Sequence, residues 1–244
     1  MQSIKKRLSN SFKNSENSYS QHAHIQQKMQ DFLIGILKKN SPISYFDRIL
    51  ELGCGIGLFS QKIAQHYNFK HFLALDIVDF SSHFNHSTIK FHQMDFENNQ
   101  ALQQLTKHKK PNLIISNAAL QWSNQEILLP QLANLIKPKG YLLLGVFGEK
   151  NLLEFKEIFK IGLNYLSLQD YEKILQKDWR ILELTQTLET LSFNHPLEAL
   201  KHIKYTGVNA FGTLPITKAH LKSYTLQFQN KITYAPLYIL AQKK

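Results

Sequence analysis

The 244-residue sequence contains one cysteine, Cys54, and this scarcity excludes several kinds of protein. A single cysteine cannot form an intrachain disulfide or a multi-cysteine metal site, and we expect no bound metal. Long apolar runs are also absent, since none reaches the roughly 18 residues that a membrane-spanning helix requires. Residues 1–7 carry charge with no apolar stretch after them, unlike a secretory signal. We therefore expect a cytoplasmic protein.

Acidic residues are in the minority, with 18 Asp and Glu against 29 Lys and Arg, and the formal net charge is +11. Such a charge favours an anionic partner, which could be nucleic acid, a membrane surface or an acidic protein. The lysines are scattered apart from short clusters such as residues 107–110, so charge alone does not choose between these partners. The sequence has no Pro/Gly/Ser-rich linker and no internal repeat, so we expect residues 1–244 to form one domain.

A glycine-rich turn is the most informative feature that is present. Residues 49–52 are an apolar strand that leads into Gly53, Gly55 and Gly57, and an amphipathic segment follows. Glycines let the backbone approach a ligand closely, and the helix that follows directs free N–H groups at it. Asp76, nineteen residues beyond Gly57, follows a second apolar run, where such folds use an acid to bind ribose hydroxyls. The pattern predicts a nucleotide-like ligand, and a turn without a ligand is the alternative.

Apolar strands and amphipathic helices alternate along the chain, which predicts an α/β fold with a doubly wound, mainly parallel sheet. One or two helices are expected before the first strand. The expected strands and helices have the following ranges: helices 3–39, 58–66 and 126–136; strands 48–52, 72–75, 89–94, 113–116, 141–147 and 232–238.

Polar or flexible residues follow four of these strands, namely Gly53, Asp76, Asp95 and Asn117. Open parallel sheets bind ligands outside the carboxyl ends of their strands. One site formed by four separate loops is therefore expected. Taken singly, Asp95 could cap a helix and Asn117 could hold a turn.

The turn itself, Glu-Leu-Gly-Cys-Gly-Ile-Gly from Glu51 to Gly57, differs from the dinucleotide fingerprint in its glycine spacing. It resembles the first motif of class I methyltransferases, in which this loop contacts the amino-acid part of S-adenosylmethionine. Cys54 is expected to be a small packing residue of this loop and not a nucleophile. The resemblance implies a cofactor site made of Glu51, Gly53, Cys54, Gly55, Gly57, Asp76, Ile77, Asp95, Phe96, Asn117 and Tyr19.

Further segments resemble one family, the malonyl-acyl-carrier-protein O-methyltransferases of biotin synthesis, over nearly the whole length. They are Phe12–Tyr19 with Ala23 and Gln26, Leu113–Trp122, Pro196–Asn209 and Ile232–Tyr238. Ala118 and Ala119 stand where methyltransferases acting on bases often have two prolines, so base methylation loses support. The chain departs from the family at Lys201, where Arg is usual, and at residues 148–155, which fit less closely.

The family implies methyl transfer from S-adenosylmethionine to the free carboxylate of a malonyl thioester on an acidic acyl carrier protein. A carboxylate is already ionised at neutral pH, so no residue is needed as acid or base, and the protein orients the reactants and excludes water. Lys201, His202 and Lys204 are the expected substrate contacts, with Tyr19 and Trp122 as aromatic walls. We expect a helical lid in residues 1–45, a cofactor-binding core in 46–150 and substrate-side helices and closing strands in 151–244.

Three alternatives are open at this point. The lysines could be solvated surface cations, and Trp122 could be ordinary core packing. The net charge would also suit a methyltransferase for RNA, although no RNA-binding module is visible and nucleic acid is not the expected partner. The chain could finally be an interaction protein that binds the cofactor without catalysis.

Overall fold

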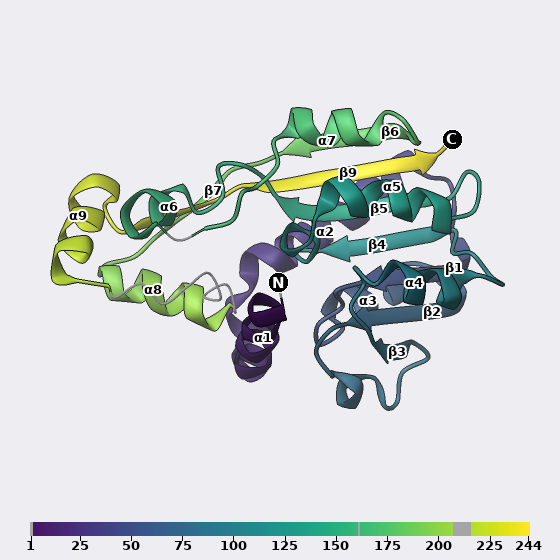
Figure 1. Cartoon of the computed structure of the whole chain (residues 1–244), viewed down its shortest axis with the longest axis horizontal. Helices are drawn as coiled ribbons and strands as arrows, with labels where there is room; N and C mark the ends of the chain where they lie inside the picture. Colours follow the sequence, from purple (N-terminus) through teal and green to yellow (C-terminus); the bar gives the residue numbers. More distant parts are fainter. Residues whose placement is uncertain (1, 161, 207–215) are drawn as a thin grey trace. The chain divides into compact units, whose positions relative to one another are not determined.

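The computed structural model describes residues 2–160, 162–206 and 216–244 (Figure 1). The chain divides into two compact units. The large unit comprises residues 26–147, 166–186 and 237–244, and the small unit comprises residues 1–25, 148–165 and 187–236. Within the described residues, no helix combines the length and the apolar character needed to cross a membrane.

The large unit is built on a sheet whose strands run in the order β3-β2-β1-β4-β5-β9-β6. The pairs β1–β2, β1–β4, β2–β3 and β4–β5 are parallel, whereas β6 pairs antiparallel with β9. This confirms the predicted doubly wound, mainly parallel sheet. The strands are β1 (Tyr45–Leu52), β2 (Asn68–Asp76), β3 (Lys90–Gln93), β4 (Leu113–Asn117), β5 (Tyr141–Phe147), β6 (Trp179–Gln186) and β9 (Pro236–Lys243).

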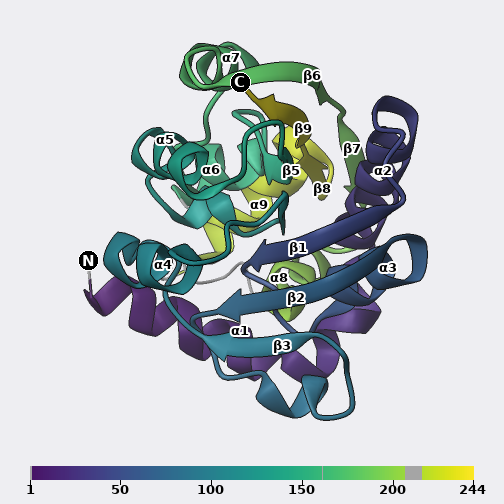
Figure 2. The same ribbon diagram turned by 90° about the vertical axis from the view of Figure 1, so that its right-hand side faces the viewer.

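Helices cover both faces of this sheet. Figure 2 shows α2 (His24–Asn40) and α3 (Leu58–His66) on one face, and α4 (Asn99–Thr106) and α5 (Gln125–Leu135) on the other. A further helix, α7 (Leu168–Leu175), leads into β6. Strands covered on both faces read as continuous apolar runs, and all seven residues of β5 are accordingly buried. The sheet of the large unit is thus covered by helices on both faces.

The small unit contains α1 (Gln2–His22), α6 (Leu153–Phe159), α8 (Pro196–Tyr205) and α9 (Lys218–Phe228), with β7 (Glu189–Ser192) paired antiparallel to β8 (Lys231–Tyr234). Its core includes a cluster of aromatic rings from Phe155, Phe159 and Tyr224. A buried carboxylate, Glu154, accepts hydrogen bonds from the backbone N–H of Thr233, at 3.0 Å, and from the Thr233 hydroxyl. These bonds attach α6 to β8.

The predicted closing strand at residues 232–238 is wrong, because this segment forms parts of two strands in two sheets. The break falls at Ala235, whose N–H donates to Asn151 Oδ1 at 3.2 Å and not to a neighbouring strand. Pro236, the next residue, has no N–H to donate. Three of the family-like positions, Gly207, Val208 and Asn209, lie outside the described residues. The single domain with its three segments stays a prediction.

Candidate functional site

The glycine loop at the end of β1 has a backbone that only glycine adopts readily. Gly53, Gly55 and Gly57 have φ angles of +71°, +52° and +83°, in the left-handed region. The N–H groups of Gly53 and Cys54 both donate to the carbonyl of Leu75, at 2.8 and 3.0 Å. The loop is therefore tied to the end of β2, and α3 begins directly after Gly57.

Asp76, the last residue of β2, is bonded to this loop. Its Oδ2 accepts from the N–H of Gly55 at 2.9 Å, and its Oδ1 accepts from the N–H of Val78 at 2.9 Å. Burial raises the pKa of the Asp76 carboxyl, while the hydrogen bonds from Val78, Gly55 and Ile77 oppose the shift. Ile77 is half-buried, and its carbonyl accepts from the amide of Gln93 at 3.1 Å. The predicted acid and the predicted loop thus lie side by side.

Two further residues predicted for the cofactor site, Glu51 and Cys54, are buried at the glycine loop. Glu51 is buried and accepts a hydrogen bond from the hydroxyl of Ser60 in α3. Burial raises the pKa of Glu51 to about 8, the Ser60 bond opposes this shift, and Asp76 adds to it. The Glu51 carboxyl is therefore protonated at neutral pH. Burial also raises the pKa of Cys54, which suits a packing thiol and not a nucleophile.

The ends of β3 and β4 complete the site. Asp95 Oδ1 accepts from the N–H of Glu97 at 3.0 Å, which folds the turn that carries Phe96. A Cβ built on Gly53 would lie 3.6 Å from Phe96 Cε1 and only 2.3 Å from the Cβ of Ala119. The turns after β3 and β4 therefore contact the glycine loop, and the structure brings the four predicted strand ends together.

Asn117, at the end of β4, presents an unusual oxygen. Its Nδ2 donates to the carbonyl of Gln26 in α2 at 3.1 Å, which fixes the orientation of the amide. Its Oδ1 is buried and has no hydrogen-bond partner within the described part of the chain. Buried polar atoms are normally paired, so this oxygen is available to a donor on a ligand.

Two glutamines that the sequence analysis missed have the same property. Gln121 donates to the carbonyl of Ala118 at 2.7 Å, and Gln30 is buried in α2. The side-chain oxygen of each is buried without a partner among the residues described. A glutamine in an amphipathic helix is expected at the surface, so nothing in the sequence indicated that Gln30 is buried. Trp122, three residues after Ala119, is half-buried in the turn after β4, and its role as a wall stays a prediction.

These residues fit S-adenosylmethionine. The cofactor carries ribose hydroxyls and an ammonium group, whose hydrogens the Asp76 carboxylate and the unpaired amide oxygens can accept. A Cβ built on Gly55 would meet no heavy atom within 4 Å, so the space beside this part of the loop is open. Within the described ranges, no three or more His, Cys, Asp or Glu side chains are grouped so that they could hold a metal ion.

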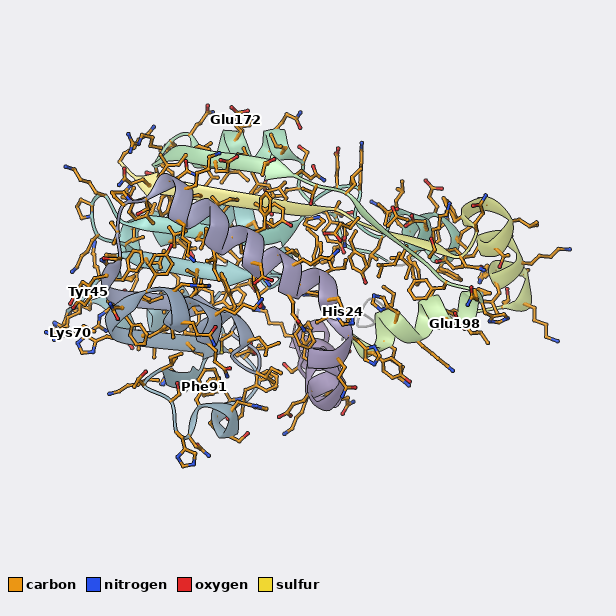
Figure 3. The ribbon with its side chains drawn as sticks, turned by 180° about the vertical axis from the view of Figure 1, so that it is seen from behind. His24, Tyr45, Lys70, Phe91, Glu172 and Glu198 are labelled. Carbon is orange, nitrogen blue, oxygen red and sulfur yellow. The ribbon has the colours of Figure 1, made fainter. Side chains whose placement is uncertain are left out.

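The other predicted contacts lie in the small unit. Lys201 and Lys204 are exposed on α8, the helix on which Figure 3 labels Glu198. His202 lies on a different side of α8 and its Nε2 is 2.9 Å from the hydroxyl of Tyr234. Burial, with smaller effects of two neighbouring histidines, lowers the pKa of His202 to about 4. His202 is therefore uncharged at neutral pH and does not offer a cation to a carboxylate.

Tyr19 lies in α1, also in the small unit, and is half-buried. Its phenol is close enough to Tyr234 to add to the raised pKa of that buried side chain. Tyr19 and His202 thus share Tyr234 as a neighbour. The substrate and cofactor roles of these residues stay predictions.

Comparison with known proteins identifies the kind of enzyme. A family profile for the methyltransferase domain matches residues 22–184. The chain is 34% identical over 92% of its length to the malonyl-(acyl-carrier protein) O-methyltransferase of Calditerrivibrio nitroreducens, of which the match covers 91%. It is 32% identical over 98% of its length to the protein of the same name from Haemophilus influenzae, with 94% of that protein covered.

Among solved structures, the chain resembles the N-methyltransferase NodS of Bradyrhizobium japonicum in complex with S-adenosyl-L-homocysteine. The TM-score is 0.51 at 13% identity, over 89% of this chain and 86% of that one. This likeness supports the fold and does not extend to the methyl acceptor.

Proposed function

The chain belongs to the malonyl-(acyl-carrier protein) O-methyltransferase family, and from this premise we propose its reaction. It transfers a methyl group from S-adenosylmethionine to the free carboxylate of a malonyl group on acyl carrier protein. The product is a malonyl methyl ester, the starter for biotin synthesis in this family. The observation that carries the proposal is identity of 34% over 92% of the chain with a protein of that name.

The residues of the large unit hold the methyl donor. When bound, S-adenosylmethionine supplies an electrophilic methyl group on a positively charged sulfur. We assign Asp76 to the ribose hydroxyls, the glycine loop to the close approach of the backbone, and Asn117 to a donor group of the cofactor. The remaining assigned contacts of the large unit are Glu51, Cys54, Ile77, Asp95 and Phe96.

The acceptor needs no base from the protein. A carboxyl group has a reference pKa of about 4, so the malonyl carboxylate is already a nucleophile at neutral pH. The carboxyl groups of Glu51 and Asp76 at the loop are already hydrogen-bonded. Glu51 accepts from the Ser60 hydroxyl, and Asp76 accepts from backbone N–H groups. The protein therefore acts by orienting the reactants and by removing water from the carboxylate.

The exposed lysines of α8 suit the carrier-protein part of the substrate. Lys201 and Lys204 lie on an exposed side of the helix that also carries Leu197 and Tyr205, which are 45% and 40% exposed. A carboxylate in a dry pocket would require a buried cation, whereas exposed cations attract a protein with an acidic face. We therefore propose that an acidic carrier protein docks on this side of α8, and that the reaction takes place in the cytoplasm.

Reversal of these charges tests the docking side. We expect Lys201→Glu with Lys204→Glu to lower kcat/KM for malonyl carrier protein about tenfold at low ionic strength, because electrostatic steering is reversed. The defect should shrink as salt is added, since exposed charges are screened. Malonyl-coenzyme A, which lacks the carrier protein, should be used equally well by the variant and the parent. The rates are measured by methyl transfer at several salt concentrations.

A matched control carries the same change of charge elsewhere. Lys107→Glu with Lys109→Glu alters two exposed lysines beyond α4, in the large unit, and should leave kcat/KM for the carrier substrate within about twofold. Equal defects in both double variants would mean that net charge matters and the α8 side does not. An unchanged rate for the α8 variant would remove these lysines from the docking surface.

The reaction itself is tested with labelled S-adenosylmethionine and a choice of acceptors. Malonyl carrier protein and bulk RNA are offered to the purified protein in separate and mixed reactions. Label in a base-labile ester on the malonyl carrier protein is expected. Label in RNA would identify the alternative of an RNA methyltransferase, and cofactor binding without transfer to either acceptor would identify a protein that is not catalytic.

A further inference from the structure

In the large unit, the side-chain amides of Gln30, Asn117 and Gln121 each have a buried oxygen without a donor among the described residues. Gln30 Oε1 in α2 and Asn117 Oδ1 at the end of β4 both lack a hydrogen-bond partner among the described residues. The Gln30 side chain is only 4% exposed, so water does not replace the missing donor at the surface. A buried carbonyl oxygen left without a donor is costly, and each such atom in a folded protein requires an explanation.

The orientation of the Asn117 amide is fixed by its neighbour. Its Nδ2 donates to the Gln26 carbonyl at 3.1 Å. Turning the amide round would place Oδ1 against that carbonyl, where two acceptors would face each other. Asn117 therefore presents an acceptor, and not a donor, to the space beside it.

One side of α2 packs on the strand ends that carry this oxygen. A Cβ built on Gly145, which pairs in register with Asn117, would lie 2.6 Å from Asn117 Oδ1. The same position is 3.0 Å from Leu33 Cδ1 and 3.2 Å from Met29 Cε. Gln26, Met29 and Leu33 share one side of the helix, so this side of α2 packs on the ends of β4 and β5.

The adjacent side of α2 faces α3. The ammonium of Lys62 in α3 lies 3.3 Å from the carbonyl of Gln27 and forms an ion pair with Asp31. With successive residues about 100° apart on a helix, Gln30 falls between the side that meets β4 and the side that meets α3. Between β4 and α3 lies the end of β1, where the glycine loop begins. The helical spacing therefore places Gln30 on the side of α2 that turns toward the end of β1.

The strand order decides which part of the cofactor lies there. β1 is flanked by β2 on one side and by β4 on the other. Asp76, the residue assigned to the ribose, ends β2, so a cofactor that crosses the glycine loop brings its amino-acid part to the β4 side. The ammonium of that part has three N–H donors and no acceptor, which matches two unpaired oxygens.

We infer that Gln30 positions the methyl donor, with its side-chain oxygen and that of Asn117 accepting hydrogen bonds from the ammonium of S-adenosylmethionine. The inference rests on the proposed function only through the identity of the methyl donor. It adds to the cofactor site a residue of α2 that lies outside the glycine loop and the strand ends.

Two ligands that differ in the amino-acid part test the role of Gln30 by calorimetric titration. S-adenosylhomocysteine contains the ammonium, and 5′-methylthioadenosine lacks the whole amino-acid part. We expect Gln30→Met to weaken S-adenosylhomocysteine about thirtyfold, as for loss of a hydrogen bond to a charged group, and to change 5′-methylthioadenosine less than about twofold. The ligand-free variant should melt at the same temperature as the parent or higher, because an unpaired buried oxygen has been removed.

Two further variants make the result decisive. Gln30→Glu keeps an acceptor oxygen and should retain S-adenosylhomocysteine within about threefold, even if Gln30→Met folds poorly. Gln27→Met, on the neighbouring side of the helix, should bind both ligands like the parent. Equal weakening of both ligands by Gln30→Met, or no weakening of S-adenosylhomocysteine, would overturn the inference. A parent protein that binds neither ligand would instead contradict the proposed methyl donor.

Discussion

Gly53→Ala should destabilise the protein by about 3 kcal/mol or more and abolish binding of S-adenosylhomocysteine. The new methyl group would lie 2.3 Å from the Cβ of Ala119, a short side chain that cannot rotate away. The φ angle of +71° adds roughly 1–2 kcal/mol for any residue with a Cβ. A decrease in the melting temperature of roughly 10 °C follows for a chain of this size. Thermal unfolding and calorimetric titration measure the two effects.

Gly55→Ala is the matched control in the same loop. Gly55 has a φ angle of +52°, but a Cβ built on it meets no heavy atom within 4 Å. Only the backbone strain should therefore appear, with a loss of about 1 kcal/mol and a decrease in melting temperature of roughly 3 °C. Equal losses of stability in the two variants would show that the contact between the loop and the turn after β4 is not formed in solution.

The stability of the protein should fall as the pH rises through the range in which Glu51 is forced to ionise. The pKa of Glu51 is about 8 in the folded protein, against 4.5 for the free side chain. Since the folded state holds the proton more tightly, the stabilisation is complete below about pH 4.5 and is lost progressively up to about pH 8. At about 1.4 kcal/mol per pKa unit, the total change is several kcal/mol.

Glu51→Gln should remove most of this dependence. Glutamine has the shape of the protonated acid and can still accept a hydrogen bond from Ser60, so the variant should match the parent near pH 5. At pH 9 the variant should be the more stable protein by several kcal/mol, because it has no buried charge to form. Urea unfolding across this pH range measures the difference. Parallel curves for the two proteins would show that Glu51 is not the titrating group, and Asp76, whose pKa is also raised, would be examined next.

Part of the fold could be predicted because local sequence signals agree with it. The helix Leu58–His66 and the strand Tyr141–Phe147 have the predicted bounds, since glycines or a Pro-Lys-Gly turn mark where they begin. The closing strand could not be predicted. Its break at Ala235 depends on a hydrogen bond to Asn151, which is 84 residues earlier in the sequence. The position of β9 between β5 and β6 could not be predicted either, because it depends on contacts between segments that are far apart in the sequence.

The candidate site likewise contains residues that could be predicted from the sequence and residues that could not. The glycine loop and Asp76 could be found because their spacing is a motif, and the rule for strand ends added Asp95 and Asn117. Gln30 and Gln121 could not be found, because a glutamine is buried here by the packing of α2 and the turn after β4 and not by any local pattern. The exposure of Lys201 and Lys204 is also a property of how α8 packs, which the residue types alone do not determine.

Methyl transfer to the free carboxylate of a malonyl group on acyl carrier protein can be followed by intact-protein mass spectrometry. Malonyl carrier protein is incubated with the enzyme and S-adenosylmethionine, and carrier protein bearing an acetyl group serves as the control. We predict that the malonyl form gains the mass of one CH₂ and that the mass of the acetyl form is unchanged. A malonyl carrier protein of unchanged mass, or equal methylation of the acetyl form, would contradict it.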